Sequence, residues 1–169
     1  MIVKIVFIAL LAAAAISDLI TYRIPNLVVI GLVVLFAIAA GLHFSDVSWF
    51  SQFGAAALSL LIGLGFYYFR QMGAGDVKLV SAIALWAGLY DAALVAFLLY
   101  VALAGLGIML VILAVRYGIV AGERLSLLKP RPPERLPRIF RLREGIPYGS
   151  AIAVGAIAAI GWFPAWLWA

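Results

Sequence analysis

Two aspartates, Asp18 and Asp76, are the residues whose setting in this sequence could support chemistry. Asp18 opens residues 18–26, which separate the first two apolar runs, and Asp76 lies in residues 73–79 (GAGDVKL), which open the fourth run. Placing a carboxylate within a membrane segment costs free energy, so such a residue usually has a function. The glycines before Asp76 allow another backbone to approach it closely. We predict that Asp18 and Asp76 meet and share a water molecule.

Such a pair of carboxyl groups hydrolyses an amide without a metal or a nucleophilic side chain. One carboxylate takes a proton from water, while a second, protonated carboxyl polarises the carbonyl and then protonates the nitrogen. Two carboxyls about 3 Å apart do not readily both ionise, so they share one proton. We expect Asp76, at a helix amino terminus, to be the mainly ionised partner, and Asp18, near a helix carboxyl terminus, the mainly protonated one. The alternative role for a single aspartate is a helix cap, and we assign Asp46 and Asp91 to it.

The elements that must position the pair are apolar. Hydrophobic residues make up 67% and charged residues 11% of the 169 residues, which is typical of a polytopic membrane protein. Continuous apolar runs favour helices, which satisfy their own backbone hydrogen bonds within lipid. We predict an all-α protein with one membrane-embedded domain over residues 1–169 and about six transmembrane helices. The apolar runs are residues 2–20, 26–42, 49–69, 77–90, 92–115 and 147–168.

Charge asymmetry predicts how the chain crosses the membrane. Eleven of the twelve basic residues fall in the odd-numbered connections, and only Lys4 lies on the other side. Cytoplasmic connections carry the excess of lysine and arginine, so both termini should face outward and both aspartates should lie at the cytoplasmic face. One alternative is that the first run is a cleavable signal peptide with small residues before its end. The residues expected in an outer aromatic belt are Trp49, Trp86, Tyr90, Trp162, Trp166 and Trp168.

Residues 116–146 form the long polar connection, with eight basic residues, three acidic residues and four prolines that oppose a continuous helix. We interpret it as a basic cytoplasmic loop that contacts anionic lipid headgroups and not nucleic acid. Lys78 should point away from Asp76, since two helical residues turn about 200°, so we expect Lys78 and Arg23 to reach the headgroups. The chain has no cysteine and one histidine, His43, and we expect no metal and no cofactor.

Three motifs in order resemble a known family. Residues 73–76 match the Gly-x-Gly-Asp motif of membrane-embedded aspartyl proteases. The combination of motifs resembles the type IV prepilin peptidases and is most similar to the short forms that serve Flp/Tad-type pili. The residues that carry this resemblance are 18–26, 75–79, and Pro147-Tyr148-Gly149-Ser150 with Ala153 and Gly155.

The resemblance implies an aspartic endopeptidase that spans the cell inner membrane several times. It would remove a short basic leader from prepilin-like precursors at the cytoplasmic face, with Asp18 and Asp76 as the catalytic pair. Prepilin-like substrates and membrane lipids are the implied partners. The residues expected to support the site are Gly73, Gly75, Pro25, Asn26, Pro147, Tyr148 and Gly149.

The chain departs from the larger members of that family, which carry a zinc-binding cysteine domain and also methylate the new amino terminus. Because this chain lacks cysteines and such an insertion, methylation is not expected. Two other classes of function fit the same acids. A small proton-coupled transporter or channel subunit would use them as a proton relay. In a non-catalytic membrane assembly factor, both aspartates could be substituted without loss of function. The substrate and the oligomeric state stay open.

Overall fold

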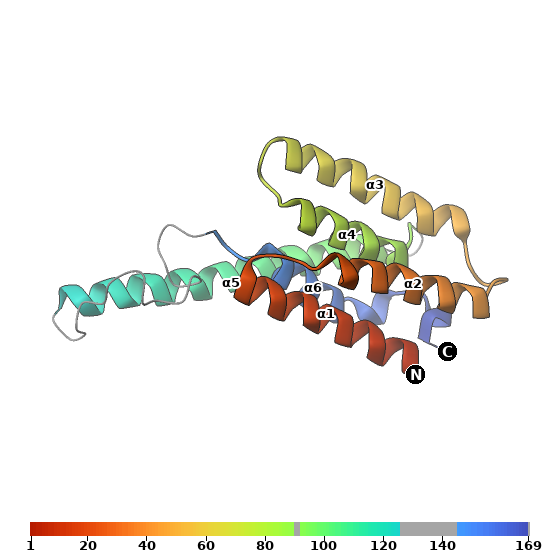
Figure 1. Cartoon of the computed structure of the whole chain (residues 1–169), viewed down its shortest axis with the longest axis horizontal. Helices are drawn as coiled ribbons and strands as arrows, with labels where there is room; N and C mark the ends of the chain where they lie inside the picture. The colour runs from red at the N-terminus through yellow and green to blue at the C-terminus, as the bar shows by residue number, and fades with distance from the viewer. Residues whose placement is uncertain (90–91, 126–144, 169) are drawn as a thin grey trace.

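The computed structural model describes residues 1–89, 92–125 and 145–168. In this part of the chain all regular structure is helical, which confirms the all-α prediction (Figure 1). The α-helices are α1 (Ile2–Thr21), α2 (Asn26–Leu42), α3 (Trp49–Tyr68), α4 (Ala74–Ala87), α5 (Ala93–Arg124) and α6 (Tyr148–Ala158). Two short 3₁₀ turns, η3 (Ile160–Trp162) and η4 (Ala165–Trp168), follow α6. Asp91 and Arg135, Arg138, Arg141 and Arg143 lie outside the described residues.

A tight connection joins α1 to α2. Tyr22 ends α1 in the left-handed conformation, with φ of 55°, and its N–H bonds to the carbonyl of Asp18. Pro25 caps the start of α2 with φ of −62°, as proline's fixed φ suits a helix start. The two helices therefore run antiparallel and side by side (Figure 1).

Small residues let neighbouring helices approach closely. On α3, a Cβ at Gly63 would lie 2.8 Å from Cγ1 of Val77 on α4. On α6, a Cβ at Gly155 would lie 2.5 Å from the backbone nitrogen of Val101 on α5. Glycine at these two positions thus sets the α3–α4 and α5–α6 distances.

Trp86 forms the centre of an aromatic core. Its ring is fully buried, lies 4.6 Å from the ring of Phe7 and stacks on Trp168 at 5.8 Å between centroids. Its Nε1–H donates to the carbonyl of Leu32 at 3.2 Å. The expectation that Trp86 belongs to an outer aromatic belt is therefore wrong, because α4 packs among α2, α3, α5 and α6.

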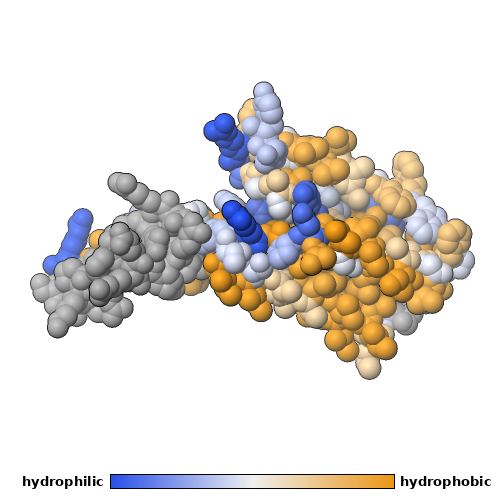
Figure 2. All heavy atoms as spheres, in the orientation of Figure 1, coloured by the Kyte–Doolittle hydropathy of each residue, from blue (hydrophilic) through white to orange (hydrophobic). Residues whose placement is uncertain are grey.

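Within the described part of the chain, three stretches are long and apolar enough to cross a membrane: α1, α3 and residues 93–122 of α5. Apolar residues cover much of the visible face of the helical body, and hydrophilic residues gather near the α1–α2 and α3–α4 connections (Figure 2). The run at 147–168 is not one helix, since α6 ends at Ala158 and Phe163 is extended. Pro164 explains the extended backbone of Phe163, because proline disfavours helical backbone at the residue before it. Helix length therefore leaves the predicted count of six spans unconfirmed.

Residues 116–124, which we predicted to open the basic loop, instead continue α5. Nothing in their sequence stops a helix, since the first proline of this connection is Pro130. Arg116 is consequently a buried helical residue with 4% of its surface exposed.

The two chain ends lie together, and the amino terminus donates to the carbonyl of Trp168 at 3.3 Å (Figure 1). The α1–α2 connection, the α3–α4 connection and the start of α6 lie at the other end of the helical body (Figure 1). This arrangement brings the two aspartate-bearing motifs to the same end.

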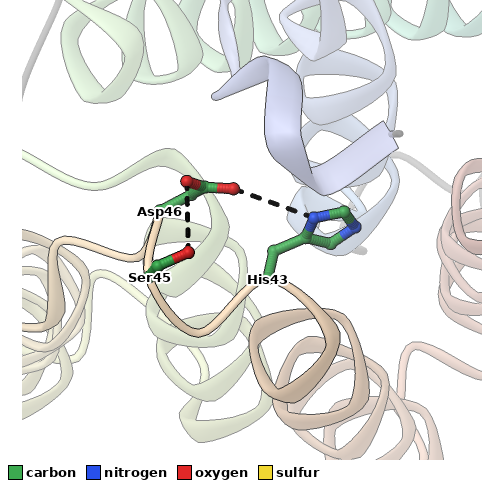
Figure 3. Close-up of polar contacts among 3 residues, drawn as sticks. All are labelled: His43, Ser45 and Asp46. Carbon is green, nitrogen blue, oxygen red and sulfur yellow. Dashed lines mark hydrogen bonds and ion pairs between the residues drawn. The ribbon is translucent and has the colours of Figure 1, made fainter.

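The α2–α3 connection holds Asp46 in local contacts (Figure 3). Its carboxyl lies 3.9 Å from Nδ1 of His43 and accepts a hydrogen bond from the Ser45 hydroxyl at 3.5 Å. We predicted a capping role, but α3 begins at Trp49, and its N-cap residue is Ser48, without a side-chain hydrogen bond. Asp46 instead holds the turn that leaves α2.

Candidate active site

Asp18 is buried in the last turn of α1, with 5% of its surface exposed. Its carboxyl reaches the first turn of α6, where the Ser150 N–H donates to Oδ2 at 2.9 Å. The Gly149 N–H is a second backbone donor to the same carboxyl. The prediction that Asp18 lies near a helix carboxyl terminus was thus incomplete, because the amino terminus of another helix faces its side chain.

Gly149 allows this approach because it has no side chain. A Cβ at Gly149 would lie 2.9 Å from Cγ of Asp18 and 2.7 Å from Cδ1 of Ile24. Both distances are shorter than ordinary van der Waals contact. Glycine at 149 is therefore a steric requirement of the position that the Asp18 carboxyl occupies.

Asp76 occupies the third position of α4. The N–H of Gly73, which precedes the helix, donates to Oδ2 of Asp76 at 3.2 Å. Asp76 is half-buried and lies outside the candidate membrane spans. Burial, and then the charge of Asp18, raise the pKa of Asp76 to about 6, while the Gly73 hydrogen bond opposes the rise. Burial and the charge of Asp18 thus both favour the protonated form of the Asp76 carboxyl.

Ile24 joins the three motifs. Its side chain packs against Gly75, where a Cβ would lie 3.4 Å from Cβ of Ile24, and against Gly149. It thus lies between the segment that carries Asp76 and the turn that holds Asp18. We did not predict this role, although an isoleucine among the polar residues of the 18–26 stretch was a signal for it.

Polar contacts tie the surrounding segments together. Lys78 donates to the Asn26 side chain at 3.4 Å, which links α4 to the start of α2. Lys78 therefore has a protein partner that our headgroup interpretation did not include. Pro147 is fully buried before α6, and its carbonyl accepts the Ser150 hydroxyl at 2.7 Å. Tyr148 is half exposed.

Two further features border the site. The buried Arg116 of α5 donates to the carbonyl of Gly145 at 3.3 Å, just before α6 begins. Gly73 lines an open cavity of about 490 Å³ together with residues 67, 68 and 70–72. Sequence patterns had placed Arg116 in a loop and did not indicate this contact.

The Asp18 and Asp76 carboxyls lie at one end of the helical body. Each accepts a backbone hydrogen bond, and each is at least partly buried. Neither carboxyl forms an ion pair with a lysine or arginine of the described residues. In the same part of the chain, no three His, Cys, Asp or Glu side chains gather as a metal site requires. A carboxyl pair of this kind is equipped to hold one proton and exchange it with a water.

Comparison with known proteins gives one match. The sequence profile of the type IV leader peptidase family matches residues 5–122. No curated protein and no solved structure matches the chain. The matched range includes both aspartates and ends before α6, which supplies the donors to Asp18.

Proposed function

The chain belongs to the type IV leader peptidase family, and from this premise we propose that it is an aspartic endopeptidase that uses Asp18 and Asp76 as its catalytic pair. The observation that carries the proposal is the convergence of the two aspartates. They come from helices far apart in sequence, and the charge of Asp18 acts on Asp76. In so apolar a protein, two neighbouring carboxyl groups do not contribute to hydrophobic packing, which favours a functional role for them.

The substrate that we propose is a prepilin-like precursor, cut at the cytoplasmic face of the inner membrane. Its leader peptide would reach Asp18 and Asp76 from the end of the helical body where the α1–α2 and α3–α4 connections lie. A water between the carboxyls would attack the scissile carbonyl, one carboxyl acting as base and the other as acid. Membrane lipids would surround the apolar helices.

The test is cleavage of a purified prepilin-like precursor by the purified protein in lipid vesicles. We expect Asp18→Asn and Asp76→Asn each to reduce the rate by at least about 10²–10⁴-fold, the usual contribution of a positioned acid or base. Asp46→Asn is the matched control, because the described polar contacts of that carboxyl are with His43 and Ser45 in the α2–α3 turn. The mass of the product should show an unmethylated amino terminus.

The same assay separates the other classes of function. A proton-coupled transporter or an assembly factor would leave the precursor uncut by the unaltered protein. Cleavage that survives either substitution, in protein that is inserted normally, would exclude the aspartate pair as the catalytic machinery.

A further inference from the structure

The two aspartates differ in the backbone groups that face them. We propose that the first turn of α6 holds Asp18 as the ionised member of the pair, so that Asp18 takes the proton from water and Asp76 carries the shared proton. This assignment rests on the proposed function and reverses the roles expected from α1 and α4 alone. It also makes Ser150 a positioning residue for the reaction.

The donors to Asp18 come from the amino terminus of a helix. Gly149 and Ser150 are the second and third residues of α6, so their N–H groups have no partner within the helix. Such groups, together with the helix dipole, favour a negative charge. The Ser150 N–H lies at 2.9 Å from Oδ2, and the Gly149 N–H adds a second donor to the same carboxyl. Hydrogen bonds to the charged form stabilise that form.

Asp76 has a weaker set of donors. It also lies at a helix amino terminus, so the dipole of α4 does not separate the two residues. Among the described residues, its one backbone donor is the N–H of Gly73, at the longer distance of 3.2 Å. Two neighbouring carboxyls do not readily both ionise. The proton should therefore stay on the carboxyl with fewer donors, which is Asp76.

No charged side chain of the described residues overrides this difference. On α4, Lys78 is bonded to Asn26 of α2. On α5, Arg116 donates to the carbonyl of Gly145. Arg23, in the α1–α2 connection, is exposed and forms no described ion pair with either aspartate. Among the described residues, no lysine or arginine therefore distinguishes the two carboxyls, and the backbone donors are the contacts that favour charge on Asp18.

The reaction balances with these roles. Asp18 takes a proton from water as the water oxygen bonds to the scissile carbonyl carbon, and the proton of Asp76 goes to the carbonyl oxygen. As the C–N bond breaks, Asp18 passes its proton to the leaving nitrogen and Asp76 takes one back from a hydroxyl of the intermediate. The pair ends with one proton, ready for another water.

Carbon-13 labelling of the aspartate carboxyls tests the assignment by NMR in the full-length protein. The chain has four aspartates, at positions 18, 46, 76 and 91, so single Asp→Asn variants identify each signal. At a pH where the pair holds one proton, we expect a carboxylate chemical shift for Asp18 and a carboxylic-acid shift for Asp76. The opposite order, or a proton divided equally between them, would overturn the assignment.

Two variants of Ser150 test the role of α6. Ser150→Ala removes the hydroxyl but keeps the N–H, whereas Ser150→Pro removes both, and proline is tolerated in the first turn of a helix. We expect only Ser150→Pro to move the Asp18 signal toward the carboxylic-acid shift and to displace the pH profile of cleavage. Equal spectra and profiles for both variants would exclude α6 as the cause. If Ser150→Pro does not fold, the order of the two signals in the unaltered protein still decides the assignment.

The outcomes also separate this inference from the proposed function. Unaltered protein that cuts no precursor would count against the peptidase. Protein that cuts the precursor with the protonation order reversed would count against the role of α6 alone.

Discussion

Replacing Gly149 with alanine should damage the site more than the fold. The added Cβ would lie 2.7 Å from Cδ1 of Ile24, 2.9 Å from Cγ of Asp18 and 3.0 Å from Oδ2 of Asp18. Ile24 can yield by turning the end of a flexible side chain. Asp18 has less freedom, because Ser150 and Gly149 hold its carboxyl. Relief to ordinary contact requires the carboxyl to move by roughly 0.5 Å.

The expected cost divides into two parts. Overpacking a well-packed site costs about 1–3 kcal/mol of stability, and misplacement of a catalytic group by about 1 Å costs up to about 10²-fold in rate. For Gly149→Ala we therefore expect a rate loss of about ten-fold or more, in protein that still inserts and folds. The measurements are kcat/KM for precursor cleavage and thermal unfolding in detergent.

A second substitution separates the two parts. Ile24→Val removes Cδ1, the closest obstacle to the new methyl group, and leaves the contact with Asp18. In the double variant we expect stability to recover more than activity. Gly161→Ala is the matched control, because a Cβ at that position meets nothing within 4 Å. Full activity of Gly149→Ala, or full recovery of activity in the double variant, would refute the argument that displaced Asp18 causes the loss.

Four further predictions concern helix packing, protonation and orientation. Gly155→Ala should destabilise the protein by about 1–3 kcal/mol or more in thermal unfolding, because its Cβ would lie 2.5 Å from a backbone nitrogen of α5, which cannot turn aside; unchanged unfolding would contradict this packing. Burial and the charge of Asp18 raise the pKa of Asp76 to about 6, so cleavage that needs the shared proton should decline as the pH rises above that value. Asp18→Asn should lower the pKa of Asp76 in a carboxyl titration, and an unchanged value would show that the two groups do not interact. In the naturally cysteine-free chain, Ser45→Cys and Gln71→Cys should react with a membrane-impermeant thiol reagent from opposite sides, and reaction from one side would refute the predicted orientation.

Local sequence patterns were sufficient for much of the helical arrangement. The run at 26–42 coincides with α2, and Pro25 marks its start as proline preferences predict. The placement of Asp18 and Asp76 near the ends of α1 and α4 also followed from the positions of the apolar runs. These features depend on residues close together in the chain, so the lengths of the apolar runs and the positions of proline and glycine predict them.

The contacts that complete the site depend on residues far apart in the chain. The hydrogen bond from Ser150 to Asp18 spans 132 positions, and its existence depends on how closely α6 packs against α1. The central position of α4 likewise made Trp86 a core residue. Apolar periodicity does not distinguish a helix face toward lipid from one toward another helix, since both are hydrophobic. This is why Trp86 was assigned to the aromatic belt and the role of Ile24 was missed.

The use of backbone donors instead of basic side chains suits a carboxyl pair that must share a proton. A lysine or arginine beside the aspartates would favour ionisation of both carboxyls and remove the acid that hydrolysis requires. Amide donors stabilise one carboxylate without adding a full positive charge, so the second carboxyl can stay protonated next to it. The nearest lysine in sequence, Lys78, is bonded to Asn26. In the proposed reaction, helix amino termini and glycines would let one carboxyl stay ionised and the other protonated, so that protons can pass in both directions during one turnover.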